Sequence, residues 1–338
     1  MPPAPNGSRN GPNGFVLDFE KPLVGLDRQI KEYESAQAKS GRDYNREIRE
    51  LRAQYLTLLK KTYRGLSRWE TVQVARHPAR PLASDYIARI VKDFVELRGD
   101  RRFGDDRAIR CGLGRIATEK VALIAQQKGR ETREKIECNF GCAHPEGYRK
   151  ALRVMKLAEK FHLPVVSLVD TPAAFPGIGS EERGVAEAIA VNLREMSRLK
   201  TPIVVALIGE GGSGGALGIA VGDHMAIMEY AYYSVAPPEA CAAILWRTGE
   251  KAPEAAEALK LTAPDLKQLD VVDEIISEPL GGAHRDPAEA ASLLERHIIR
   301  KLRDLKRFGI DSLLQRRYQR WRRMGKVIRQ EASEVSRK

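Results

Sequence analysis

Apolar residues recur at intervals of three and four along several stretches of the chain, as they do on one face of an amphipathic helix. The first such stretch runs from residue 26 to 60 and is otherwise highly charged. It is interrupted at Ser40-Gly41, so we expect two helices that pair as a hairpin. Further helices are expected over 148–161 and from Ser180, which is placed to cap the second of them.

A helix is also expected after Ser84, another residue suited to a helix N-cap. Its predicted apolar face consists of Ile87, Ile90, Val91, Phe94 and Val95.

Short runs of β-branched and other apolar residues alternate with these helical stretches and indicate strands. Two runs, around Ile116 and over 121–125, flank Thr118-Glu119-Lys120 and predict a β-hairpin. Other strands are expected over 163–169, 203–208, 226–228 and 233–235. Strands that are separated by helices indicate an α/β fold and not an all-α or all-β one.

The most distinctive stretch is PIVVALIGEGGSGGALGIAVGD, from Pro202 to Asp223, in which a buried strand is expected to lead into glycines and then a helix. Five of the seven residues from Gly209 to Gly215 are glycine. Such a turn at a helix N-terminus leaves backbone N–H groups free to face an oxygen that carries negative charge. We interpret it as an anion-binding turn, in preference to glycines that only let a helix pack closely on a sheet.

Three common patterns match these glycines, and pattern matching alone does not choose among them. Residues 209–214 fit the G-x-G-x-x-G of dinucleotide-binding proteins, but they come late in the chain instead of opening a βαβ unit. Residues 211–215 fit the G-x-S-x-G of hydrolases and the G-x-x-x-G of membrane helices, although the strand-like first half argues against a span. A hydrolase triad would be drawn from Ser213, Asp273 and either His284 or His297.

Two other groups of residues are candidates for substrate binding. Lys128, Arg130, Arg133 and Lys135 form a cationic cluster after a predicted strand, suited to a phosphate group and equally to a solvated loop. The loop 170–180, DTPAAFPGIGS, follows another predicted strand, which is the usual place for binding sites in open α/β sheets.

The positive charge of the chain is concentrated near its end. The 338 residues carry a net charge of +12, and segment 298–338 contains 14 lysines and arginines against 4 acidic residues. Such a tail suits nucleic acid, phosphate or an anionic partner surface, and equally a solvated or subunit-facing helix end.

Neither a secretory signal nor a membrane span is predicted, so we expect a cytoplasmic protein. The first residues, MPPAPNGSRNGPNG, are rich in proline, glycine and asparagine and predict a disordered lead. The four cysteines do not form a disulfide framework, and no histidines are spaced as zinc ligands with a carboxylate, so no metal is expected in this chain.

Seven phrases carry a more specific signal: FVLDFEKPL, ARHPARP, QKGRETREKIECNFGCAHPEGYRKALR, DTPAAFPGIGSEERG, REMSRL, GEGGSGGALGIAVGD and EPLGGAHRDP. In this order they resemble the family of α subunits of bacterial acetyl-CoA carboxylase carboxyltransferases over nearly the whole chain. The resemblance implies a crotonase-type α/β fold of repeated ββα units, with an N-terminal helical hairpin and C-terminal helices. We therefore expect a disordered lead (1–20), an N-terminal helical region (21–80), a crotonase-like core (81–280) and a basic helical extension (281–338).

The resemblance also implies an α2β2 enzyme of fatty acid synthesis that transfers the carboxyl group of carboxybiotin to acetyl-CoA, giving malonyl-CoA. This chain would supply the carboxybiotin half and a zinc-ribbon β chain the acetyl-CoA half, with biotin carboxyl carrier protein and biotin carboxylase as further partners. In that family backbone N–H groups steady the ureido oxygen of biotin, and motif matching assigns this role to Gly211 and Gly212. Substrate-binding residues are expected to include Ser213, Gly214, Gly215, Pro176, Gly177, Lys128 and Arg130.

Four positions depart from the family pattern. Ala173 and Phe175 stand where DTPGAYPG is common, and Pro237 and Ala240 stand where a Ser-Pro-Glu-Gly pattern is common. They leave the glycine turn intact and put the substrate fit in question.

Two other classes of function stay open at this point. A stand-alone crotonase-type hydratase or isomerase would need a placed carboxylate as acid or base, and no glutamate is convincingly positioned near the turn. A nucleic-acid binder would use the basic tail.

Overall fold

The computed structural model describes residues 15–325, and within them the centre of the molecule is an eight-stranded sheet. The strand order is β1-β2-β3-β4-β5-β6-β8, and β7 pairs with the far end of β5. Strands β1 to β3 are antiparallel neighbours, whereas β3, β4, β5, β6 and β8 run parallel. The strands are β1 (Val91–Glu96), β2 (Ile109–Ile116), β3 (Glu119–Gln126), β4 (Val165–Thr171), β5 (Ile203–Gly212), β6 (His224–Met228), β7 (Tyr232–Ser234) and β8 (Glu274–Ile276).

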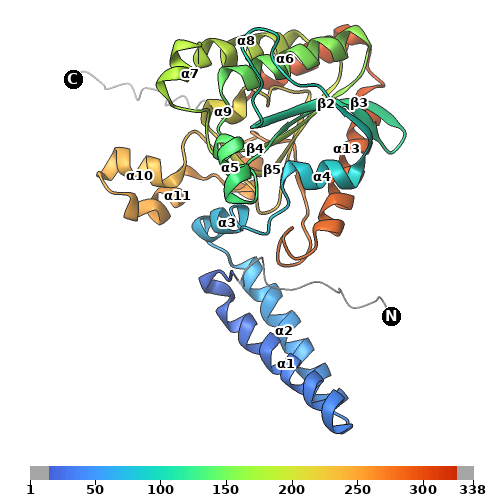
Figure 1. Cartoon of the computed structure of the whole chain (residues 1–338), viewed down its shortest axis with the longest axis vertical. Coiled ribbons are helices and arrows are strands. Elements are labelled where there is room, and N and C mark those ends of the chain that lie inside the picture. The colour runs from blue at the N-terminus through green and yellow to red at the C-terminus, as the bar shows by residue number, and fades with distance from the viewer. Residues whose placement is uncertain (1–14, 326–338) are drawn as a thin grey trace, which may run out of the picture.

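Helices cover both faces of the sheet, so its central strands are buried throughout. Every residue of β4 and of β5 is buried, which explains their continuous apolar runs. Helices α6 (Pro145–Lys160) and α8 (Val185–Arg198) pack against each other, and α6 contacts β2 and β3 (Figure 1). Helix α13 (Pro287–Leu305) contacts β5 and β8, and its Leu294, Ile298 and Leu302 belong to the main core.

Shorter helices connect these elements. They are α4 (Ala83–Ile90), α5 (Thr132–Glu137), α7 (Ile178–Glu182), α9 (Ser213–Leu217), α10 (Pro238–Trp246), α11 (Ala252–Leu259), α12 (Ala263–Gln268) and α14 (Ile310–Arg322), with 3-10 turns η2 (Asp18–Glu20), η3 (Asn139–Gly141) and η4 (Gly249–Lys251).

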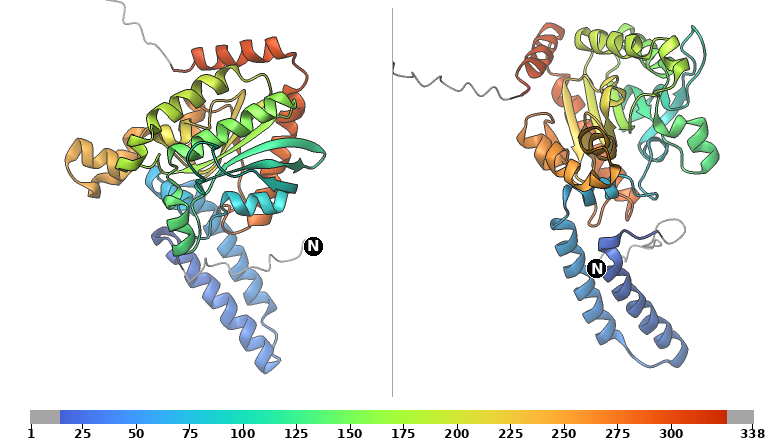
Figure 2. Two further views of the ribbon diagram at one scale, coloured as in Figure 1. Left: turned by 45° about the horizontal axis from the view of Figure 1, so that its top comes forward. Right: turned by 90° about the vertical axis from the view of Figure 1, so that its left-hand side faces the viewer.

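The expected N-terminal hairpin is confirmed. Helices α1 (Lys21–Ser40) and α2 (Asn45–Arg64) lie side by side and project from the body of the molecule, which α3 (Arg68–Ala75) joins to them (Figures 1 and 2). Gly41 ends α1 with a φ of 67°, a conformation that favours glycine. Ile30, Ile48 and Leu59 share a small core of their own between the two helices.

The helix expected after Ser84 is shorter than predicted. It ends at Ile90, and Val91, Phe94 and Val95 lie in strand β1. Pairing with β2 shifts register between Lys92 and Val95, and this bulge turns Val91 and Phe94 toward the same face of β2. Val91 and Phe94 are three positions apart and share a face because of the bulge, and this spacing was misread as helical.

The two predicted N-caps are also wrong. Leu82 is the N-cap of α4, where its N–H donates to the Asp85 carboxylate over 2.7 Å. Ser180 lies inside α7, whose N-cap is Gly177, and the Ser180 hydroxyl is 2.6 Å from Nδ1 of His144. The helix expected from Ser180 is also divided at Gly184 into α7 and α8, so spacing placed the helical segments but not their first residues.

The prediction that residues 1–20 are disordered is wrong for residues 15–20. Residues 1–14 lie outside the described part, but Leu17 and Glu20 are buried against the hairpin. The Glu20 carboxylate accepts hydrogen bonds from Tyr63, over 2.8 Å, and from Arg285. These bonds tie the segment before α1 to α2 and to the loop before α13.

Part of the basic tail is also internal. Arg317 is 1% exposed and donates to the Asp223 carboxylate and to three backbone carbonyls. Arg320 pairs with Asp273 over 2.9 Å. These two cations hold α14 on the core and are not available to an external anion, while residues 326–338 lie outside the described part.

Candidate functional site

The candidate site lies where the parallel strands end. Lys128 follows β3, Asp170 lies near the end of β4, and Glu210 lies near the end of β5. A cavity of about 420 Å³ opens there, at the edge where ligands bind in open α/β sheets. Its charged lining residues are Arg76, Arg80, Lys128, Arg130, Glu131, Lys135, Asp170 and Glu210, and Phe140 is part of its wall.

Strand β5 continues farther into the glycines than the sequence predicts. It extends through Gly212, so that Gly211 lies opposite Thr171 of β4 on one side and Tyr233 of β7 on the other. Gly212 is the N-cap of α9. Ser213, the first residue of α9, has a φ of 56°, which is uncommon for a residue with a side chain.

The glycines of this turn have no side chains, and the backbone of the loop after β4 lies close against them. A Cβ at Gly212 would lie 1.8 Å from the carbonyl oxygen of Pro172, and one at Gly215 would lie 2.3 Å from the carbonyl carbon of Ala173. A Cβ at Gly209 would lie 2.5 Å from Oδ1 of Asp170. Close packing against the loop after β4 is therefore one firm reason for these glycines, and an anion-binding role for their N–H groups stays a prediction.

A buried charge network holds the start of the turn. The ammonium of Lys128 lies 2.5 Å from Asp170 and 2.7 Å from Glu210. Oε1 of Glu210 accepts from Arg76 and from the Tyr232 hydroxyl, each over 2.6 Å. Burial by itself would raise the pKa of Glu210, but the charges of Lys128 and Arg76 outweigh it and hold the pKa at about 2. Glu210 is thus ionised and fully bonded.

The end of the turn is held by residues that the sequence analysis did not single out. Gln126, at the end of β3, donates to the carbonyl of Gly215 over 2.8 Å, and the Tyr148 hydroxyl donates to the same oxygen over 3.3 Å. The carbonyl of the Gln126 side chain accepts from the N–H of Asp170 over 3.1 Å. A polar residue at the end of an otherwise apolar strand was the one available signal for Gln126.

The predicted cationic cluster is divided. Arg133 and Lys135 are exposed, and Arg133 pairs with Glu137 over 3.1 Å, whereas the other two cations are committed to internal partners. Lys128 bonds to two carboxylates, and Arg130 donates to Asp85, over 2.5 Å, and to the carbonyl of Pro78, over 3.4 Å. Arg130 and Lys128 do line the cavity, together with Lys135.

The predicted loop residues lie beside the glycine turn. Gly177 packs against Phe175, since a Cβ there would lie 2.4 Å from the Phe175 ring, and that ring lies 4.2 Å from the His144 imidazole. Pro176 lies between these two residues, in the loop whose Pro172 contacts Gly212. Ser213 and Gly214 are half-buried and Gly215 is buried.

The residues nominated for a hydrolase triad do not come together. His297 contacts His224, His284 stacks on His77, and Asp273 pairs with Arg320. Ser213 therefore has no assembled base among its nominated partners.

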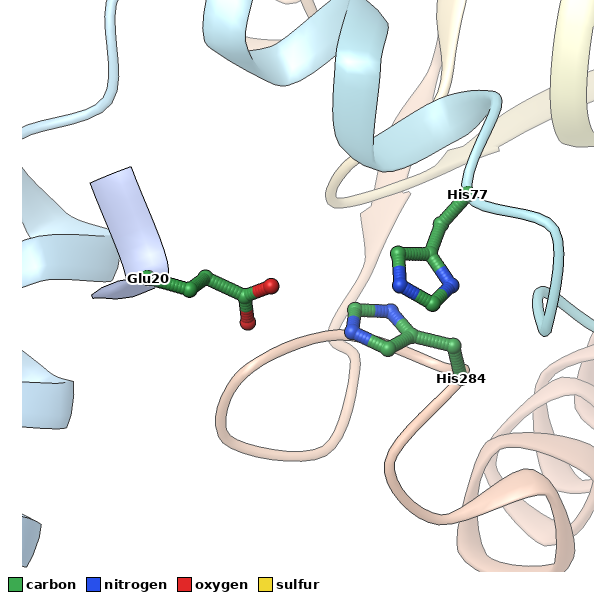
Figure 3. A group of neighbouring side chains, drawn as sticks. All are labelled: Glu20, His77 and His284. Atoms are coloured by element: carbon green, nitrogen blue, oxygen red, sulfur yellow. The ribbon is translucent and has the colours of Figure 1, made fainter. Parts of the chain in front are cut away.

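Two clusters of histidines and carboxylates form from residues far apart in sequence. In the first, ligand atoms of Glu20, His77 and His284 lie within 4.8 Å of one another, and Figure 3 shows the two rings one over the other beside the carboxylate. The rings are 4.0 Å apart and nearly parallel, so their in-plane lone pairs do not converge on one point. Arg285 and Tyr63 already bond to Glu20, and we do not assign a metal here.

The second cluster, His224, Glu274 and His297, has a direct hydrogen bond between two imidazoles. The Nε2 atoms of His224 and His297 are 3.0 Å apart, and Nδ1 of His297 lies 3.2 Å from the guanidinium of Arg300. Arginine can only donate, so His297 accepts at Nδ1 and donates from Nε2 to His224. Burial lowers the pKa of both histidines to about 4, and both are neutral at pH 7.

This pair makes stability depend on pH. The unfolded histidines titrate near pH 6.5, so between about pH 6.5 and 4 the unfolded state binds more protons and stability falls as the pH falls. Between pH 7 and 5 we expect a loss of roughly 2 kcal/mol for each histidine that stays neutral. Urea unfolding at the two pH values measures it, and a His224→Leu/His297→Leu variant should show a smaller loss. An exposed-site control, His162→Gln, should keep the loss, and equal slopes in all three proteins would contradict the assignment.

No helix within residues 15–325 combines the length and the apolar character that crossing a membrane requires.

The amino-acid sequence is similar to those of known carboxyltransferases. Residues 16–325 match the family model described as acetyl co-enzyme A carboxylase carboxyltransferase-like. The chain is 52% identical over 312 residues to the acetyl-coenzyme A carboxylase carboxyl transferase subunit alpha of Geobacter metallireducens, covering 92% of this chain and 98% of that protein. It is 51% identical over 307 residues to the same subunit of Vibrio campbellii, covering 90% and 96%.

Solved structures show the same fold at low identity. Transcarboxylase 12S matches with a TM-score of 0.52 and 20% identity over 67% of this chain, and the β subunit of geranyl-CoA carboxylase from P. aeruginosa with 0.52 and 18% over 70%. The match covers 44% and 45% of those two chains, so this chain corresponds to less than half of each. The expected crotonase-type α/β fold is confirmed.

Proposed function

Because the chain belongs to the acetyl-CoA carboxylase carboxyltransferase family, we propose that it is the α half of a two-chain enzyme that carries a carboxyl group from carboxybiotin to acetyl-CoA. The product is malonyl-CoA, and biotin arrives attached to its carrier protein, which biotin carboxylase loads. The same proposal places the enzyme in the cytoplasm.

The observation that carries the proposal is the glycine turn at the carboxyl end of β5. It is fixed at one end by Lys128, through Glu210, and at the other by Gln126, through the carbonyl of Gly215. Donors that are fixed before the reaction stabilise a developing negative charge without reorganising, which is the property of an oxyanion hole. This geometry fits a ureido oxygen, which needs hydrogen-bond donors and no metal.

The residues of this chain would hold and orient the biotin ring. Carboxybiotin, when bound, supplies the carboxyl group. The N–H groups of Gly211 and Gly212 would donate to its ureido oxygen. Ser213 to Gly215 and the loop with Pro176 and Gly177 would form the walls around the biotin ring and exclude water from it. Arg130 lies on the wall of the adjoining cavity, where it can meet an anionic part of a substrate.

A second chain completes the proposal. The two solved carboxyltransferases named above are more than twice as long as the part that matches this chain. A partner of similar fold, the β chain, would supply the acetyl-CoA half and the acyl oxyanion hole, in an α2β2 assembly. The zinc ribbon is expected in that β chain.

The test is malonyl-CoA formation from acetyl-CoA and carboxybiotin by this chain alone, by the β chain of the same organism alone, and by the two mixed. We expect turnover only in the mixture, because each chain holds one half of the site. Size-exclusion chromatography of the mixture checks that the chains assemble. Turnover by this chain alone, or none in an assembled mixture, would contradict the proposal and favour a stand-alone crotonase-type hydratase or isomerase, or a binding role.

A further inference from the structure

We propose that Lys128 is a positioning residue, which holds the glycine turn in its reactive geometry and does not bind the substrate itself. The inference rests on the proposed function for its kinetic consequence, but its structural half can be tested without turnover.

The ammonium of Lys128 joins the two segments that form the site. It bridges Asp170, in the strand that leads into the loop after β4, and Glu210, which directly precedes the two glycines. Oδ1 of Asp170 also accepts the N–H of Glu210 over 2.9 Å, so the same carboxylate binds Lys128 and the β5 backbone. Lys128, Asp170 and Glu210 thus form a closed ring of bonds around the first peptide of the turn.

The aliphatic part of the Lys128 side chain is also fixed in place, by packing. A Cβ on Gly141 would lie 2.7 Å from Cγ of Lys128, so the aliphatic chain packs directly against that glycine. The side chain is 16% exposed and is one of the residues that line the cavity. Two of the three ammonium donors are taken by buried carboxylates, which leaves little of Lys128 for a phosphate.

Loss of Lys128 would leave two buried carboxylates close to each other without their shared cation. Asp170 and Glu210 carry side chains that are 4% and 8% exposed, and their mutual repulsion would act on the peptide between Gly209 and Glu210, whose N–H donates to Asp170. Arg76 and Tyr232 still hold Glu210 from its other oxygen, so the fold is not left without support. The expected result is a folded protein with a displaced glycine turn.

Amide hydrogen exchange tests this step without any assay of turnover. In full-length Lys128→Met, assembled with its partner, we expect peptides covering residues 209–215 to exchange at least about tenfold faster than in the wild type. Peptides of α13 serve as the reference and should keep their rate. Unchanged exchange at 209–215 would overturn the inference, whether or not the wild-type enzyme makes malonyl-CoA.

Kinetics tests the consequence for catalysis. We expect Lys128→Met to lower kcat about 10²-fold, the usual cost of a misplaced oxyanion donor, with KM for acetyl-CoA changed less than about threefold. A phosphate-binding lysine would instead raise KM at nearly constant kcat, and that result would overturn the inference.

Lys150 provides a matched control. Its side chain is more deeply buried, 2% exposed against 16% for Lys128, and its ammonium bonds to Asp105 and to the carbonyl of Asp106, each over 2.6 Å, but it has no bond to the turn. Lys150→Met should lose stability and keep kcat per folded molecule within about twofold. If it lost kcat as severely as Lys128→Met, general destabilisation would explain both and the inference would fall. Should Lys128→Met not fold, Lys128→Arg keeps the charge, and it should show a lower kcat at unchanged KM.

Discussion

Replacing Gly212 by alanine should disable the enzyme and destabilise the chain, although the change adds only one methyl group. The new Cβ would lie 1.8 Å from the backbone oxygen of Pro172, where no side chain can move aside to relieve the contact. The loop after β4 and the end of β5 must separate instead. We expect a loss of about 3 kcal/mol or more in the free energy of unfolding, at the upper end of overpacking, and at least about 10²-fold in kcat.

Gly214 is the matched control two residues farther on. A Cβ there meets only Ile189, at 3.8 Å, which is an ordinary van der Waals contact. Because residue 214 lies inside α9, Gly214→Ala should leave stability unchanged or raise it by up to about 1 kcal/mol. Chemical denaturation of both variants, together with turnover of Gly212→Ala, decides the matter. Equal effects at the two positions would show that contact with the loop is not what requires glycine at 212.

The second large effect is expected at Arg317. Its guanidinium is fully buried, donates twice to Asp223 and satisfies the carbonyls of Met196, Leu199 and Thr201. Arg317→Met would leave the Asp223 carboxylate, 3% exposed, without its cation. Breaking a buried ion pair from one side costs about 3–5 kcal/mol, and we expect a loss of that size in urea unfolding.

The neighbouring Arg316 separates this explanation from a role in nucleic-acid binding. Arg316 is exposed and lies over the ring of Phe308 at 4.2 Å. Arg316→Met should change stability by less than about 0.5 kcal/mol. If both variants were as stable as the wild type and Arg317→Met alone lost retention on RNA, the buried role of Arg317 would be wrong.

The sequence predicted the elements of the core well because its strands are buried on both sides. The continuous β-branched runs at β4 and β5 fit few secondary structures other than a buried strand, and turn residues mark the ends of both strands. Strand β1 was missed because its bulge depends on pairing with β2, and a bulge changes the side-chain period from two to three. Spacing along one strand cannot show what its neighbour imposes.

At the site, the sequence identified the glycine turn but could not show what surrounds it. Lys128 was predicted as one of four cations after a strand, suited to a phosphate group and equally to a solvated loop. Its partners, Asp170 and Glu210, are 42 and 82 positions away, and they meet it only because β3, β4 and β5 end at one edge of the sheet.

The sequence by itself determined the fold class, the family and the position of the glycine turn. These depend on the local order of residues and on motifs that can be recognised without a structure. The tertiary structure alone decided which charges are internal. Burial turns Lys128 and Arg317 from solvated cations into the partners of specific carboxylates, because an unpaired charge in the interior costs several kcal/mol. Whether a charge is buried depends on contacts between distant segments, and neither composition nor spacing records those contacts.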